Sequence, residues 1–202
     1  MTMTMNNLSY FFFSKHWFRR RSIEKIISNY FLSFSEGLAK GTFLEIGCAS
    51  GIGSFLIKNY FSPNKIVSID LDERMVEVAR KKIQDPSITF ENGDASKLKF
   101  ENNHFDAIFD FIVIHHIPDW KGCLRELYRV LKPGGKFFIY EVSIESFDGL
   151  YGKIMKITSE HPYEKMYRRV DFIQYLKKIG FKIIKEENIK NIKRNFTIVA
   201  EK

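Results

Sequence analysis

Residues 43–53 read Phe-Leu-Glu-Ile-Gly-Cys-Ala-Ser-Gly-Ile-Gly, an apolar run that passes directly into a glycine-rich turn. The run predicts a buried strand, and glycines without side chains would let a ligand come close to the turn. A second apolar run, residues 65–70, ends in Asp70. In nucleotide-binding folds, a carboxylate at the tip of the strand after a glycine loop holds the ribose hydroxyls. The two runs together predict a site for a nucleoside-bearing cofactor.

Segments that resemble strands alternate with segments that resemble helices around this stretch. Strands are expected at residues 42–47, 65–70, 88–92, 107–111 and 136–141, and helices at residues 53–60, 73–83 and 120–131. Such alternation is typical of a parallel sheet with helices on both faces. A turn is expected at Lys132-Pro-Gly-Gly135, because proline ends a helix and glycine adopts positive φ. We therefore predict an α/β fold with a Rossmann-like, doubly wound sheet.

The C-terminal part of the chain has a different pattern. Residues 142–170 have no clean period, and a segment of that length between elements is usually a functional lid. A short helix is expected at residues 171–178, followed by two strands at residues 181–188 and 195–200. Their short connection predicts an antiparallel C-terminal hairpin, which brings the mostly parallel sheet to seven strands.

An apolar stripe at helical spacing runs along residues 9–39. The stripe predicts a helix, which we expect to cover a sheet edge or a lid. The alternative is a helix on a membrane surface, because aromatic residues and arginines are mixed in this segment. The expected organisation is one domain over residues 1–202. Its parts are a helical cap (1–40), a cofactor-binding core (41–141), a lid or acceptor region (142–170) and a C-terminal helix and hairpin (171–202).

The composition is that of an ordinary soluble protein. The 202 residues are 45% hydrophobic and 28% charged, which fits one domain with a full-sized core. The formal net charge of +8 allows an anionic partner such as nucleic acid, or simply a surface solvated by lysines. The dense basic block is Arg19-Arg20-Arg21.

Neither a metal site nor a disulfide is expected from the two cysteines. Cys48 and Cys123 are far apart in the sequence and have no histidine at ligand spacing. The apolar run at residues 10–13 is too short for a signal sequence or a membrane span. The cytoplasm is therefore the expected location.

The glycine loop can be compared with three nucleotide-binding patterns. The nicotinamide pattern G-x-G-x-x-G fails from Gly47, because Ala49 and Ile52 stand where glycines are needed. The phosphate loop of ATPases fails because no lysine follows the glycines. The remaining pattern, E/D-x-G-x-G-x-G, serves a nucleoside without phosphate groups.

The sequence of residues 45–51 resembles the first motif of class I S-adenosylmethionine-dependent methyltransferases. Further segments resemble later motifs of that family, in the family's order: residues 70–75, 92–95, 105–119 and 124–136. The resemblance covers about residues 41–141. One position departs from it, since Ala49 replaces the middle glycine. An alanine there is comfortable only at negative φ, and its methyl group would narrow the space beside the methionine part of the cofactor.

The resemblance implies S-adenosyl-L-methionine as cofactor, with S-adenosyl-L-homocysteine as product. It implies that Asp70 accepts both ribose hydroxyls and that Leu71 lies against the adenine. Asp94 would accept from the adenine amino group, and the amide of Ala95 would donate to the ring. The alternative for Asp94, which follows a glycine, is a plain turn residue.

The resemblance also assigns residues to the methionine part of the cofactor. Gly47 and Gly51 would let the chain pass close to the sugar and the methionine, and Phe111 would add backbone contacts. Glu45 would order the loop or meet the cofactor's ammonium group. The alternative for Glu45 is a buried structural acid, which needs polar partners.

Candidate catalytic residues follow the fourth strand. His115 and His116 stand beside the expected methyl group, and histidine titrates near neutrality, so either could act as a general base. The alternative is that one histidine packs or bonds to the backbone while the other is solvated. An acceptor pocket could be lined by Glu141, Tyr151, His161, Tyr163 and Tyr167.

Three functions remain open at this level. The first is methyl transfer to a small molecule, favoured because the chain has no separate recognition domain. The second is a non-catalytic, Rossmann-like interaction protein with weakened cofactor affinity, which Ala49 keeps open. The third, an RNA or protein methyltransferase, depends on the net charge of +8 and on Arg19–Arg21.

Overall fold

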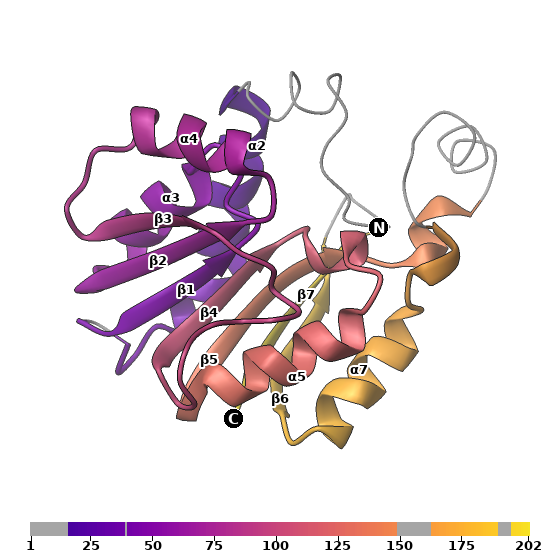
Figure 1. The fold of residues 1–202 in the computed structure, drawn as a ribbon. Helices are drawn as coiled ribbons and strands as arrows, with labels where there is room; N and C mark the ends of the chain where they lie inside the picture. The colour runs from indigo at the N-terminus through magenta and orange to yellow at the C-terminus, as the bar shows by residue number, and fades with distance from the viewer. Residues whose placement is uncertain (1–15, 39, 149–162, 190–194) are drawn as a thin grey trace.

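A computed structural model of the chain describes residues 16–38, 40–148, 163–189 and 195–202. Within them a seven-stranded sheet has the order β3-β2-β1-β4-β5-β7-β6 (Figure 1). The strands are β1 (Thr42–Ile46), β2 (Lys65–Asp70), β3 (Ile88–Asn92), β4 (Phe105–Phe111), β5 (Leu131–Val142), β6 (Lys182–Asn188) and β7 (Asn195–Glu201). The predicted α/β fold with a Rossmann-like sheet is confirmed.

Strand directions explain how the site is assembled. β3, β2, β1, β4 and β5 pair in parallel, so their carboxyl ends meet at one edge of the sheet. β7 pairs antiparallel with both β5 and β6, which confirms the predicted C-terminal hairpin. In this hairpin β7 is the inner strand, and β6 forms the edge of the sheet. The order of the strands reverses between β1 and β4, and α/β sheets bind their ligands outside such a point.

Helices cover both faces of the sheet. Figure 1 shows α2, α3 and α4 on one face and α5 and α7 on the other. Their bounds are α2 (His16–Ile26), α3 (Ile52–Phe61), α4 (Glu73–Lys82), α5 (Trp120–Val130) and α7 (Arg169–Lys178). Short 3₁₀ turns, η3 (Ile114–His116), η4 (Ile144–Phe147) and η5 (Tyr163–Lys165), lie beyond the ends of β4 and β5.

Two apolar cores result from this layering. The core under α5 and α7 contains residues such as Ile108, Leu127 and Phe137. The core under α2, α3 and α4 is rich in aromatic rings, and Phe109 and Phe138 stack there with centroids 4.7 Å apart. Because the central strands are buried on both faces, their sequences are nearly continuous apolar runs.

Two elements differ from the sequence expectation. The N-terminal helix is α-helical only to Ile26 and then continues as a π-helix (Ile27–Phe31) and a 3₁₀ turn (Leu32–Phe34); its expected beginning lies outside the described residues. The turn expected at Lys132–Gly135 is incorrect, because β5 already begins at Leu131. The pairing of β5 with β4 shifts its register here. Gly134 has a φ of 75°, and its amide N–H donates to the carbonyl of Lys202 at 2.8 Å.

Candidate cofactor site and active site

The loop between β1 and α3 turns back through left-handed residues. φ is 61° at Gly47, 45° at Ala49 and 83° at Gly51, and Gly51 is also the N-cap of α3. The amide of Cys48 donates to the carbonyl of Ile69 at 3.0 Å. The loop is thereby held against the end of β2, at the carboxyl edge of the sheet.

Glycine is required in this loop partly by the chain's own side chains. A Cβ at Gly47 would collide with Val113, which belongs to the turn after β4. A Cβ at Gly53 would collide with the Oε1 atom of Glu45 and press on Phe111. The sequence explained these glycines by the approach of a ligand; internal packing is a second reason, which only the tertiary structure reveals.

Asp70 joins the glycine loop to the following turn. Its Oδ2 atom accepts the amide N–H of Ala49 at 2.8 Å, and its Oδ1 atom accepts that of Asp72 at 2.9 Å. Burial raises the pKa of Asp70, although these amides and the nearby charge of Arg19 oppose the effect. The residue is half-buried at the carboxyl end of β2, beside the loop.

An apolar side chain lies exposed directly after this carboxylate. Leu71 is 37% exposed, unusual for a large apolar residue of this chain. An exposed apolar side chain beside a polar site can serve as a contact for a flat ring. After the next strand, β3, Asp94 accepts the amide and hydroxyl of Ser96 at 2.8 and 2.7 Å, both through Oδ1, and Ala95 is buried. The turn geometry proposed as the alternative for Asp94 is therefore present.

Glu45 lies beneath the loop in the interior. It is fully buried and accepts hydrogen bonds from the hydroxyls of Ser54 and Ser68, the second at 3.3 Å. Its Oε1 atom has no hydrogen-bond partner among the described residues. Burial raises the pKa of Glu45 to about 7, although the bond from Ser54 and the charge of Arg19 oppose this. The arrangement corresponds to the structural alternative for Glu45, an acid that supports the loop from below.

The raised pKa of Glu45 predicts a pH-dependent stability. A pKa of about 7 in the folded chain, against an ordinary value of 4.5, means that folding favours the protonated acid. Its stabilising contribution is complete below pH 4.5 and is lost as pH rises through about 7, by on the order of 3 kcal/mol. Urea unfolding of Glu45→Gln should show a smaller loss of stability over this range than the native chain. Glu77→Gln, on the exposed face of α4, is the control, and its free energy of unfolding should depend on pH as that of the native chain does. The same pH dependence in Glu45→Gln would contradict the raised pKa of Glu45.

The φ angle of Ala49 is positive, whereas an alanine is comfortable only at negative φ. A negative φ was expected, yet its φ is 45°, because the loop must turn back to place its amide on Asp70. A left-handed alanine costs about 1–2 kcal/mol, and a glycine costs about 0.5–1 kcal/mol in chain entropy. Ala49→Gly should therefore stabilise the chain by up to about 1 kcal/mol in thermal unfolding.

A matched control exists in a regular helix. Ala79 is buried in α4, where the same substitution should destabilise by about 1 kcal/mol. If Ala49→Gly raises the free energy of unfolding and Ala79→Gly lowers it, the loop conformation is responsible for the difference. Destabilisation by both substitutions would contradict a strained Ala49.

The two histidines occupy the turn after β4 and have different environments. His115 is buried, and its Nδ1 atom lies 2.9 Å from Oε2 of Glu141 at the end of β5. His116 is half-buried, and its ring centroid lies 3.9 Å from that of His115. The Oε2 atom of Glu141 also accepts the amide of Val142 at 2.8 Å. A carboxylate on Nδ1 fixes the tautomer with its proton there, so that Nε2 carries the lone pair of the neutral ring.

A second buried carboxyl group lies beside Glu141. Asp110 is fully buried, accepts the amide of Val113 at 3.1 Å through Oδ1, and has no donor to Oδ2 among the described residues. Burial, and next the charge of Glu141, raise the pKa of Asp110 well above its usual range. Burial would also raise the pKa of Glu141, but the adjacent His115 and the amide of Val142 outweigh it and lower that pKa. The two pKa values are thus shifted in opposite directions, so that protonation is favoured at Asp110 and ionisation at Glu141.

The sequence placed Glu141 and Tyr167 in an acceptor pocket but missed their grouping with Asp110. The buried hydroxyl of Tyr167 lies near both carboxyls; burial and the charge of Glu141 raise its pKa well above the usual range. An acid inside the apolar run of β4 was the available signal for Asp110. Tyr151 and His161 lie outside the described residues.

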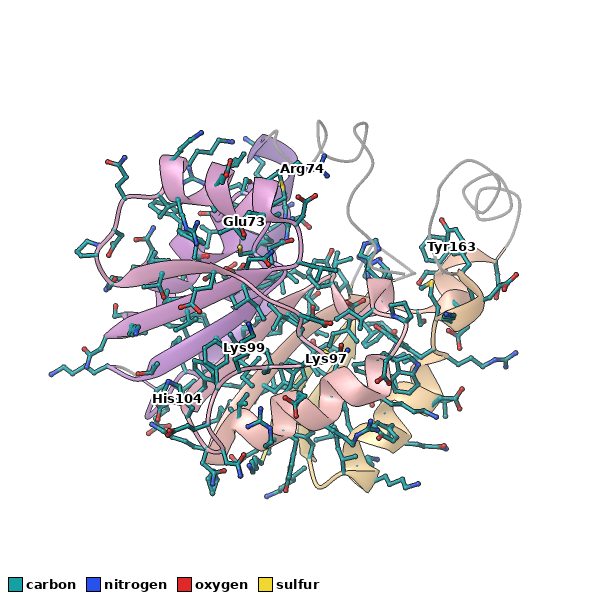
Figure 2. The ribbon with its side chains drawn as sticks, viewed as in Figure 1. Glu73, Arg74, Lys97, Lys99, His104 and Tyr163 are labelled. Atoms are coloured by element: carbon teal, nitrogen blue, oxygen red, sulfur yellow. The ribbon has the colours of Figure 1, made fainter. Side chains whose placement is uncertain are left out.

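Of the remaining predicted residues, Tyr163 and Phe111 lie at the carboxyl edge of the sheet. Tyr163 is buried against Phe147, with ring centroids 5.0 Å apart. Figure 2 labels Tyr163 beyond the end of β5, Arg74 at the start of α4, and His104 at the opposite, amino end of β4. Phe111 is buried at the end of β4, with its ring in the core under α3.

Comparison with known proteins identifies the domain. Residues 44–139 match the family model described as "Methyltransferase domain". This stretch of the chain is therefore similar to methyltransferase domains. Its span coincides with β1 to β5, the glycine loop, Asp70 and His115.

The chain is also similar to named methyltransferases. The chain is 28% identical over 193 residues to the sterol 24-C-methyltransferase of Kluyveromyces lactis, covering 90% of this chain and 52% of that protein. It is 33% identical over 104 residues to the demethylmenaquinone methyltransferase of Lactococcus lactis, covering 50% of this chain and 41% of that protein. The chain spans about half the length of the curated relatives it matches.

A solved structure shares the fold. The crystal structure of an S-adenosylmethionine-dependent methyltransferase from Mesorhizobium loti superposes with a TM-score of 0.75 at 17% identity, covering 91% of this chain and all of that one. Of the helices in the described ranges, none has the length and apolar composition of a membrane-spanning segment. In the same ranges, no three His, Cys, Asp or Glu side chains gather as a metal site.

Proposed function

We propose that this chain transfers the methyl group of S-adenosylmethionine to a small-molecule acceptor. The observation that carries the proposal is the Asp70 carboxylate. It lies at the tip of β2, bonded to the amide of Ala49 in the glycine loop and followed by the exposed Leu71. This is the arrangement that a ribose and an adenine ring require next to each other.

The residues present fit an adenosyl cofactor. Asp70 can accept two hydroxyls through its two oxygens, and Leu71 offers an apolar surface to the adenine. The turn at Asp94 and Ala95 follows the neighbouring strand, whose last residue, Asn92, pairs with Asp70, so that the turn can reach the edge of the ring. Glu45 supports the loop, while Gly47, Gly51 and Phe111 bring backbone close to the methionine part. When bound, S-adenosylmethionine supplies a methyl group that is already activated by its positively charged sulfur.

We propose His115 as the general base for acceptors that must lose a proton. The Nδ1–H group donates to Glu141, and Nε2 is the atom that takes the proton. The negative charge of Glu141 stabilises the imidazolium that results. Asp110, protonated beside Glu141, keeps a second negative charge out of the cluster. For an acceptor that needs no base, positioning alone provides the rate enhancement.

The named relatives and the described ends of the expected lid support one class of acceptor. Named relatives act on a sterol or on demethylmenaquinone, which are small and mostly apolar. The described ends of the lid also bring an aromatic pair, Phe147 and Tyr163, to this edge. We propose a small, mostly apolar acceptor that binds between His115 and the pair formed by Phe147 and Tyr163.

The basic block at the N-terminus does not favour a nucleic-acid substrate. Arg19 turns inward, with its Nη2 atom 3.4 Å from the carbonyl of Gly47. Only Arg20 and Arg21 of the block are exposed, and Arg20 lies over the ring of Phe55. A basic surface for phosphate groups is therefore smaller than the sequence suggests.

Two measurements on the same preparation test the function. Calorimetry should detect saturable binding of S-adenosylhomocysteine. Product formation from S-adenosylmethionine should then appear with members of a panel of sterols, quinols and phenols. Binding without transfer to any acceptor would support the non-catalytic alternative. No binding of either nucleoside would contradict the proposed function.

A further inference from the structure

The N-terminal helix brings an arginine to the cofactor loop. α2 packs on α3 through its buried residues Ile23 and Ile26. Polar contacts add to this, because Tyr60 of α3 donates to Glu24 at 3.3 Å. The docked helix places the guanidinium of Arg19 at the carbonyl of Gly47, the first residue of the loop.

The charge of Arg19 acts on the acids of the site. Burial raises the pKa of both Asp70 and Glu45, and the positive charge of Arg19 opposes the rise in each case. Arg74, the basic residue at the start of α4, already pairs with Asp72 at 2.5 Å. The Asp70 carboxylate repels an anionic ligand group unless a cation is placed beside the site.

S-Adenosylmethionine carries such an anionic group at the end opposite its adenine. The adenosine end is assigned to Asp70 and Leu71, so the methionine end extends along the loop toward Gly47. We propose that Arg19 binds the α-carboxylate of the cofactor's methionine part. This inference rests on the proposed function. A planar guanidinium can pair with a carboxylate through two parallel N–H bonds, which a lysine cannot do.

The assignment predicts a ligand-selective loss of affinity. Calorimetric titrations compare S-adenosylhomocysteine with 5′-methylthioadenosine, which keeps the adenosine and the thioether but lacks the amino-acid part. Arg19→Gln should weaken S-adenosylhomocysteine about ten- to a hundredfold and leave methylthioadenosine unchanged within about twofold. Arg19→Lys should recover part of the affinity, because it restores the charge without the second donor.

Control variants separate this role from a structural one. Arg20→Gln removes a neighbouring arginine of the same helix that lies over Phe55, and it should leave both affinities unchanged. Equal losses for the two ligands in Arg19→Gln, or no loss for S-adenosylhomocysteine, would overturn the assignment to the carboxylate. Failure of the native chain to bind either ligand would overturn the proposed function as well. The midpoint of thermal unfolding shows whether each variant is folded.

Discussion

Replacement of Asp70 by asparagine is expected to weaken S-adenosylhomocysteine binding about a hundredfold or more, as the loss of two charge-assisted hydrogen bonds implies. Asparagine retains one carbonyl oxygen, so it can still accept the amide of Ala49 or that of Asp72. It cannot accept from two ribose hydroxyls at once. Calorimetric titration of native and variant chains measures the ratio of dissociation constants.

The neighbouring acid provides the control for this variant. Asp72 is the N-cap of α4 and is paired with Arg74, and asparagine caps helices about as well as aspartate. Asp72→Asn should therefore keep the affinity for S-adenosylhomocysteine within a few-fold of the native value. It removes one negative charge, as Asp70→Asn does, but two residues farther along the chain. If Asp70→Asn and Asp72→Asn had equal affinities, the ribose would not lie on Asp70.

Replacement of Glu141 by alanine should cause the largest loss of stability, about 3–5 kcal/mol in urea unfolding at neutral pH. Glu141 accepts from the ring and the backbone of His115 and from the amide of Val142, and all these donors are buried. Removal of the carboxylate leaves them without an acceptor and leaves a cavity as well.

Asp110 should respond very differently, although it is just as buried. Its raised pKa favours the protonated form, and asparagine has the shape of a protonated aspartate and can donate to Glu141. Asp110→Asn should therefore cost less than about 1 kcal/mol, within the range of tolerated isosteric changes. A loss as large as that of Glu141→Ala would mean that Asp110 is ionised, and a small loss in Glu141→Ala would remove the argument for a buried charge cluster.

The sequence predicts those parts of the fold that local pattern determines. Strands such as β2 and β3 are found at their expected residues, because an apolar run bounded by polar turns is a local property. The conformation around Lys132–Gly135 could not be predicted from such signals. There the backbone pairs with the end of β7, far along the chain, and this pairing outweighs the local preference of proline and glycine for a turn.

The same distinction applies to the site. Asp70 is visible in the sequence, because a carboxylate at a strand tip after a glycine loop is a local pattern typical of ribose binding. The partner of His115 is not visible, since Glu141 reaches it only through the parallel pairing of β4 with β5. Arg19 was grouped with a basic block, and its position at the loop depends on how α2 packs against α3.

A crystal structure of the chain with S-adenosylhomocysteine tests the central claim most directly. We predict that the ligand lies across the carboxyl edge of β1, β2 and β4, with both ribose hydroxyls within hydrogen-bond distance of the Asp70 carboxylate and the adenine against Leu71. Ligand density at another place, or ribose hydroxyls turned away from Asp70, would contradict it.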